Sequence, residues 1–242
     1  MRQLGQHRFL TFGNEVEQSC LDTHKPHRLE HVYTQAMLLG LLLQGAPRSA
    51  LVLGLGGGSL VRALRHVLTD LDITAIESRQ GVIDMAVRWF ELDPDDTRLS
   101  LVCADAEEFL ACDTAGGYDL VFADLYQAAG VHPGQNTPGF LALCRERLNE
   151  QGLLLLNQWS SEYRDSVLAR EALQTVFGNG IAHLQVQGGN VIAFGFKSGI
   201  PRLDGKRLFA DALALGQALE IPLHTLARNF TRQNRATLRA GR

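Results

Sequence analysis

Residues 51–77 constrain the fold of this chain more than any other stretch. An apolar run at 51–55 ends in three glycines at 56–58, a helical run extends to about residue 68, and a second apolar run ends at Glu77. A strand, a glycine-rich turn, a helix and a second strand closed by an acid are typical of a βαβ unit that binds a nucleotide at its carboxyl edge. The stretch therefore predicts an α/β fold with a ligand site at this turn.

Each part of this unit has a physical role in holding a nucleotide. Glycines permit positive φ and let a ligand approach the main chain, while a helix that begins near Ser59 points free N–H groups toward it. Glu77, about twenty residues past the glycines, is placed to accept hydrogen bonds from two ribose hydroxyls. The glycines that we assign to the pocket are Gly54, Gly56, Gly57 and Gly58.

Strand and helix patterns alternate through the rest of the core. Apolar runs predict parallel strands at residues 50–54, 72–77, 98–103, 119–124 and 152–157, each followed by a helix. Such near-continuous apolar strands indicate a parallel sheet covered on both faces. Runs at 181–187 and 191–197, joined by Gly188, Gly189 and Asn190, predict a terminal hairpin. A mostly parallel, Rossmann-like sheet with an antiparallel end resembles the class I S-adenosylmethionine (AdoMet)-dependent methyltransferases.

Three regions are expected along the chain. Residues 1–32 hold two short alternating segments around Gly13 and Asn14, which predict a small β-hairpin. Residues 33–200, beginning with a helix at 33–44, form the Rossmann-like domain. Residues 201–242 form a helical extension with an amphipathic helix at 204–219, a shorter helix at 224–228 and a basic tail. We interpret that tail as a solvated terminus, not a nucleic-acid site.

Composition narrows the class of protein. The net charge of −3 favours neither nucleic acid nor an anionic membrane as a partner, and no apolar run is long enough to span a bilayer. The four cysteines lack metal-ligand spacing and indicate a reducing compartment, with Cys103 and Cys144 expected as buried thiols. Three histidines, His24, His27 and His31, fall in a basic loop, so we predict no metal site. A cytoplasmic location follows.

Residues spread over most of the chain resemble the spermidine synthase family of polyamine aminopropyltransferases. The features that carry the resemblance are Gln18 in the N-terminal hairpin, the helix opening at Tyr33, the glycine turn, Glu77, Asp105 after the third strand, and the motif at 118–124 that ends in Asp124. The resemblance implies transfer of an aminopropyl group from decarboxylated AdoMet to a diamine. It also implies that Gln18, Glu77 and Asp105, with Ala106 beside it, hold the nucleoside, and that Asp124 orients the attacking amine and takes its proton.

Elementary chemistry agrees with those roles. Asp105 and Asp124 follow apolar strands, so both are expected at the carboxyl edge where ligands bind in open α/β sheets. An amine attacks only when it is neutral, so a carboxylate that accepts its proton lowers the barrier. Asp105 is also a candidate N-cap for the helix that follows it.

The chain departs from the family pattern on the acceptor side. Ser59 stands where the family has an Asp facing the donor's aminopropyl nitrogen, Gln127 replaces the second acid of the strand-four motif, and Thr34 replaces the His or Gln after the family tyrosine. We nevertheless assign Tyr33, Thr34, Ser59, Tyr126 and Gln127 to the acceptor pocket. Trp159 is a further candidate for an aromatic wall there.

Charge makes these departures consequential. A dication needs carboxylates to offset its desolvation, and loss of one such partner costs about 2 to 5 kcal/mol. A neutral Ser59 at a helix N-terminus also accepts a donor carboxylate that an Asp would repel. We therefore expect a spermidine synthase-like transferase that binds AdoMet, decarboxylated AdoMet or methylthioadenosine and does not make spermidine efficiently.

Other functions stay open at this point. Methyl transfer and aminopropyl transfer to an unusual amine displace at the same sulfonium, a non-catalytic nucleoside-binding module would bind without turnover, and a nicotinamide oxidoreductase would fit the glycine turn and Glu77. We expect a small-molecule acceptor, with an amine as a candidate class, no nucleic-acid or membrane partner, and a homodimer.

Overall fold

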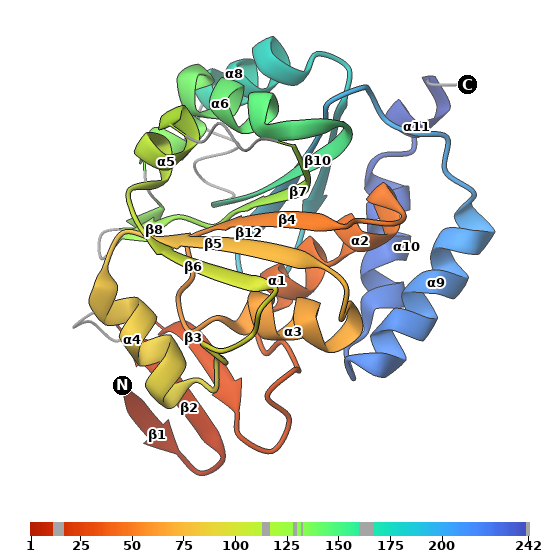
Figure 1. Ribbon diagram of the computed structural model, residues 1–242. Coiled ribbons are helices and arrows are strands. Elements are labelled where there is room, and N and C mark those ends of the chain that lie inside the picture. The colour runs from red at the N-terminus through yellow and green to blue at the C-terminus, as the bar shows by residue number, and fades with distance from the viewer. Residues whose placement is uncertain (12–16, 113–116, 128–129, 132, 160–166, 241–242) are drawn as a thin grey trace.

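A seven-stranded sheet forms the centre of the molecule (Figure 1). The computed structural model describes residues 1–11, 17–112, 117–127, 130–131, 133–159 and 167–240. The sheet order is β11-β12-β10-β7-β4-β5-β6. Its strands are β4 (Ser49–Leu53), β5 (Asp72–Glu77), β6 (Leu99–Cys103), β7 (Tyr118–Ala123), β10 (Leu148–Trp159), β11 (Ile181–Gln185) and β12 (Asn190–Phe196). Strand β12 runs antiparallel to both of its neighbours and lies one place in from the edge, so the predicted hairpin is present.

Apolar side chains alternate between the two faces of the sheet, as the near-continuous apolar strands require. In β4, Ala50 and Val52 join one hydrophobic cluster, whereas Leu51 and Leu53 join the other. Both clusters are buried because helices cover both faces (Figure 1).

The helices divide between these two clusters. One face packs against α1 (Val32–Met37), α2 (Leu39–Gln44), α3 (Ser59–Val67), α4 (Gln80–Trp89), α9 (Gly205–Ala218) and α10 (Leu223–Gln233). The other face packs against α5 (Ala106–Cys112), α6 (Pro138–Arg147) and α8 (Val167–Phe177). A small antiparallel pair, β8 (Tyr126–Gln127) and β9 (Gly130–Val131), and the 3-10 helix η1 (Pro133–Asn136) follow β7. In the part of the chain that is described, no helix is long and apolar enough to cross a membrane.

The N-terminal residues form a separate three-stranded antiparallel sheet. It consists of β1 (Arg2–Leu4), β2 (His7–Thr11) and β3 (Glu17–Asp22), in that order. The predicted pairing of β2 with β3 is present, the turn at Gly13 and Asn14 lies outside the described residues, and β1 was not predicted. Leu10 and Leu21 of this sheet pack on Val82 and Phe90 of α4, which attaches the sheet to the main domain.

The helix predicted at 33–44 is interrupted. At Leu38 the backbone N–H bonds to Gln35 O at 3.2 Å, a tighter turn than an α-helix makes, and α2 begins at the next residue. Gly40 then lies against Leu155, where an added Cβ would come within 2.7 Å of a side-chain carbon. The interruption therefore lets α2 pack closely on β10.

The C-terminal prediction was wrong in two respects. Helix α10 is longer than the segment 224–228, and α11 (Thr237–Ala240) follows it. Leu223, Leu226 and Phe230 anchor α10, since all three are buried and Phe230 meets Phe194 of β12 edge-on at 5.0 Å, whereas Arg228, Arg232 and Arg235 of the predicted basic tail are exposed as expected. Local composition, rich in arginine, concealed an apolar stripe at helical spacing.

The cysteine prediction was half right. Cys144 is buried, but Cys103 is exposed, because it ends the edge strand β6 and has no strand beyond it. Cys20 is buried and Cys112 exposed.

Candidate functional site

A cavity of about 560 Å³ opens at the carboxyl edge of the sheet. This volume falls in the usual range for small-molecule sites. It is lined by residues that follow β4, β5, β6 and β7, by residues of β3, by the N-terminal part of α1 and by the turn between β11 and β12. The predicted site residues that line it are Gln18, Tyr33, Thr34, Gly54, Gly56, Ser59, Glu77, Asp105, Ala106 and Asp124.

The glycine turn has two different surfaces. Gly54, at φ +91°, lies so close to the end of β7 that an added Cβ would meet Asp124 O at 2.2 Å. Gly54 and Gly56 line the cavity, whereas Gly57 and Gly58 are buried and do not. Gly57 N donates to Ser19 Oγ at 2.8 Å, so this part of the turn holds the N-terminal sheet in place.

Acidic side chains at one end of the cavity are held by bonds within their own segment. Glu77 is 6% exposed, and its Oε1 accepts from the backbone N and from Nε of Arg79, both at 3.2 Å. Asp105 Oδ1 accepts from Glu107 N at 2.8 Å and from Glu108 N at 3.1 Å. Asp105 therefore caps α5 as well as lining the cavity, as expected for an acid at a helix N-terminus.

Asp124 lies at the other end and is held by side chains from distant segments. The Tyr33 hydroxyl donates to its Oδ2 at 3.1 Å, and Asn157 Nδ2 donates to its Oδ1 at 2.8 Å. Burial raises the pKa of the Asp124 carboxyl above its ordinary value of 3.8, while the bonds from Asn157 and Tyr33 and the nearby His31 act in the opposite direction. A carboxylate with a raised pKa is suited to accept a proton.

Asn157 is itself fixed by a buried network. Its Oδ1 accepts from Asn190 Nδ2 at 2.9 Å, and its backbone O accepts from Gln135 Nε2 at 2.7 Å. Gln135 Oε1 in turn accepts from Leu125 N at 3.2 Å, next to Asp124. This network joins β10, the β11–β12 hairpin and η1 around the carboxyl group of Asp124.

His31 adds an imidazole to the same end. Burial lowers its pKa, against the attraction of Glu17, Asp124 and Glu30, so the ring is neutral at pH 7. Its Nε2 is enclosed and has no hydrogen-bond partner among the described residues. Glu17, Glu30 and His31 all line the cavity. The Asp124 end therefore combines three carboxyl groups with a neutral base.

The structure places some of the remaining acceptor candidates at the cavity and does not describe the side chains of the others. Thr34 lines the cavity, but its Oγ1 donates to His31 O at 2.7 Å and is already satisfied. Trp159 lines the cavity as well. For Tyr126 and Gln127 the structure describes the backbone strand β8 and not the side chains, so their assignment to the pocket stays a prediction.

Sequence reasoning missed several residues of this end. Asn157 could have been found in the same way as Asp124, because each is a polar residue at the end of an apolar strand. Glu30 and His31 stand three and two residues before Tyr33, in the segment that we interpreted only as a basic loop without a metal site. Asn190 gave no signal, because a turn asparagine is ordinary in a hairpin.

One group of potential metal ligands is present among the described residues. Side-chain atoms of His7, Asp22 and Glu30 lie within 4.8 Å of one another. Asp22 already accepts from His24 N at 2.9 Å and from Gln6 Nε2 at 3.2 Å, and Glu30 pairs with Arg28 at 3.5 Å. These hydrogen bonds engage the Asp22 carboxylate, whereas Glu30 Oε1 is buried and has the ion pair with Arg28 but no hydrogen-bond partner among the described residues.

Comparison with known proteins identifies a related family. A sequence model of the spermine/spermidine synthase domain matches residues 30–183, which is more than half of the chain. Every predicted site residue except Gln18 falls inside that range. A polyamine aminopropyltransferase from Chromobacterium violaceum is 28% identical over 193 residues, which span 80% of this chain and 74% of that protein.

Solved structures share the architecture. A probable spermidine synthase from Corynebacterium glutamicum superposes with a TM-score of 0.70 at 18% identity, covering 90% of this chain and 85% of that one. Human methyltransferase-like protein 13, solved in complex with SAH, superposes with a TM-score of 0.62 at 24% identity, covering 81% and 90%. At these identities the likeness establishes the fold, which confirms the predicted methyltransferase-like α/β class.

Proposed function

Because this chain belongs to the spermine/spermidine synthase family, we propose that it is a transferase that takes a sulfonium nucleoside, AdoMet or decarboxylated AdoMet, in the cavity at the sheet edge. The observation that carries the proposal is that Glu77, at the end of β5, and Asp124, which follows β7, line one cavity with β4 between their strands. Glu77 holds the ribose, and Asp105 and Ala106 lie at the adenine. The sulfonium then lies between the glycine turn and Asp124.

The acceptor is a small molecule, and the charges favour an amine. Glu17, Glu30 and Asp124 all attract a proton on His31, so an ammonium group at that point is stabilised by all three. Asp124, held by Tyr33 and Asn157, accepts the proton that the amine loses as it attacks. The amine nitrogen displaces the sulfonium sulfur from a carbon of the donor, and the sulfur leaves as a neutral thioether.

We propose that this protein does not synthesise spermidine efficiently. Thr34 is a buried threonine whose hydroxyl is bonded to His31 O, so it does not offer the polar contact that a His or Gln would. Ser59 and Gln127 supply no charge for the second ammonium group of a dication, and Glu17 and Glu30 are already paired with Arg2 and Arg28. We expect an acceptor with one cationic centre, bound at the Glu17, Glu30 and Asp124 end.

Incubation of the purified protein with each donor and a panel of mono- and diamines tests the proposal. Transfer of the aminopropyl or aminocarboxypropyl group releases methylthioadenosine, whereas methyl transfer releases S-adenosylhomocysteine from AdoMet and its decarboxylated analogue from decarboxylated AdoMet, so the nucleoside product identifies the bond that is broken. Robust formation of spermidine from putrescine would contradict the proposed acceptor class. Binding of nucleosides without any turnover would identify a non-catalytic module instead.

Methyl transfer is the second candidate, and Ser59 favours it. A neutral hydroxyl at the first residue of α3 does not repel the carboxylate of intact AdoMet. Release of S-adenosylhomocysteine with no methylthioadenosine decides for this alternative.

A further inference from the structure

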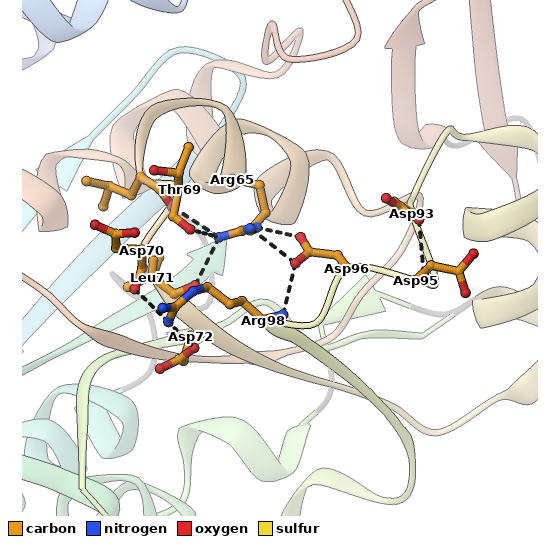
Figure 2. Close-up of polar contacts among 10 residues, drawn as sticks. Arg65, Thr69, Asp70, Leu71, Asp72, Asp93, Asp95, Asp96 and Arg98 are labelled. Atoms are coloured by element: carbon orange, nitrogen blue, oxygen red, sulfur yellow. Dashed lines mark hydrogen bonds and ion pairs between the residues drawn. The ribbon is translucent and has the colours of Figure 1, made fainter.

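Two arginines on successive turns of α3 have opposite environments. The Arg65 guanidinium is paired with the Asp96 carboxylate through Nε at 2.5 Å and Nη2 at 3.1 Å, as Figure 2 shows. Arg62 donates to four uncharged oxygens instead. These are Gly57 O and Phe90 O at 2.5 Å, Pro26 O at 3.0 Å and Ser59 Oγ at 3.3 Å.

Arg62 has no described carboxylate within ion-pair distance. Glu91 is the acid that stabilises its charge most, but Glu91 is paired with Arg8 at 3.7 Å. Desolvation lowers the pKa of Arg62 to about 10, so the guanidinium remains charged at pH 7. A largely buried charge without a counter-ion is costly, and carbonyl dipoles offset only part of that cost.

The position of this cation connects it to the cavity. Its Nη1 bonds to Gly57 O in the glycine turn, and its Nη2 bonds to the hydroxyl of Ser59, which lines the cavity. Ser59 is also the first residue of α3, and the N-cap Gly58, at φ +71°, offers no side chain to the free N–H groups. The buried charge and the helix N-terminus therefore create a positive potential at the same part of the cavity wall.

We propose that Arg62 makes the site selective for a donor that carries a carboxylate, so that intact AdoMet binds in preference to decarboxylated AdoMet. The two donors share the adenosine and the sulfonium and differ in that one group. A carboxylate near Ser59 supplies a counter-ion that no described acid provides to Arg62, and the low-dielectric wall preserves their attraction. This inference rests on the proposed function, because it assumes that the cavity holds a sulfonium nucleoside.

Two substitutions remove the effect by different routes. Arg62→Gln removes the charge and keeps hydrogen-bond donors for the carbonyls. Ser59→Asp introduces a carboxylate about 3 Å from the guanidinium, which neutralises Arg62 internally and repels a donor carboxylate. An acid is favourable in the first turn of a helix, so Ser59→Asp is expected to fold.

The test is calorimetry on the full chain with AdoMet, decarboxylated AdoMet and methylthioadenosine. Wild-type protein is expected to bind AdoMet about tenfold or more tightly than the decarboxylated donor, as an ion pair at intermediate dielectric allows. Arg62→Gln should bring the ratio close to one, and Ser59→Asp should invert it. Arg62→Lys, which keeps the charge, should retain the preference.

A matched control separates selectivity from stability. Arg65→Gln removes the paired arginine one turn along α3 and should leave the ratio of the two donor affinities unchanged. Methylthioadenosine lacks the sulfonium, ammonium and carboxylate charges, so its affinity reports the nucleoside pocket alone. A purely structural role for Arg62 would weaken all three ligands equally.

The outcomes are distinguishable. An unchanged ratio in Arg62→Gln, with all nucleosides still bound, overturns this inference and leaves the proposed function in place. If Arg62→Gln fails to fold, the wild-type ratio decides, because equal affinity for the two donors overturns the inference. Absence of binding by all three compounds overturns the proposed function and this inference with it.

Discussion

The two ends of the cavity differ in the sequence separation of the residues that hold their carboxyl groups. At the Glu77 end, each acid bonds within its own segment, Glu77 to Arg79 and Asp105 to Glu107, two residues along. At the Asp124 end, the carboxyl group bonds to Tyr33, 91 residues away, and to Asn157, 33 residues away. The first end follows from local chain geometry, whereas the second exists only once distant segments have packed.

The two ends also differ in the charge of the groups that bond to their carboxylates. Glu77 has a cationic partner in Arg79. The hydrogen-bond donors to Asp124 are neutral, and the two further acids near His31 have arginine partners, Glu17 with Arg2 at 3.9 Å and Glu30 with Arg28 at 3.5 Å. We infer that the Glu77 end is organised for binding and the Asp124 end for proton transfer.

The largest expected effect is at the Asp124 end, where one substitution should reduce proton transfer without weakening donor binding. Asp124→Asn removes the proton acceptor and should reduce turnover by about 10²- to 10⁴-fold, while donor affinity stays within about twofold. Release of nucleoside product measures turnover, and calorimetry measures affinity.

Asp119→Asn is the matched control for that substitution, because Asp119 lies at the opposite end of β7 and bonds to Arg48 N at 2.7 Å. It should affect stability and leave turnover intact. Full activity in Asp124→Asn would falsify the assignment of Asp124 as the base.

The second effect concerns the Glu77 end. Glu77→Gln loses the charge that strengthens hydrogen bonds to a ribose, which is worth about 1.5 to 3 kcal/mol, so methylthioadenosine should bind about 10- to 100-fold more weakly. Glu108→Gln, an exposed acid outside the cavity lining, should bind normally. Equal affinity in both variants would show that the nucleoside does not lie against Glu77.

The third effect concerns a residue that positions Asp124. Asn157→Ala removes the amide that lowers the pKa of Asp124, so that pKa should rise further and the acidic limb of the pH–rate profile should move to higher pH. We expect kcat at pH 7 to fall about tenfold, with KM for the donor little changed.

Asn157→Gln keeps an amide and should restore part of the rate. A variant that merely loosened the fold would lower the rate at all pH values equally, without moving the limb.

The smallest effect is on stability. Because the folded pKa of Asp124 is raised, the folded protein binds this proton more tightly than the unfolded chain, and ionisation of Asp124 destabilises the fold. The favourable contribution is complete below the ordinary value of 3.8 and is lost as pH rises through the folded pKa. Asp124→Asn should therefore raise Tm at pH 7, and the gain should vanish near pH 3.5. Thermal unfolding at both pH values checks this, and a loss of Tm at pH 7 would contradict it.

Several predictions from sequence failed for identifiable reasons. The helix at 224–228 was predicted too short because the arginines after it were weighed above the apolar spacing of Leu223, Leu226 and Phe230, which α10 buries. Cys103 was expected inside because its strand is apolar, but β6 proved to be an edge strand. In both cases the missing information was which neighbour each element has.

The sequence by itself determined the strand–turn–helix unit at 51–77, the parallel sheet with its terminal hairpin, and the acids Glu77, Asp105 and Asp124 at strand ends. These follow from local rules, since apolar periodicity sets the strands and parallel strands place their carboxyl ends at one edge. Only the tertiary structure decided that Tyr33, Asn157 and Asn190 hold Asp124, and that His31 and two glutamates join it. It alone also decided that Arg62 bonds to Ser59 with no described carboxylate in ion-pair contact. Such contacts depend on packing between segments far apart in the chain, and no local pattern encodes that packing.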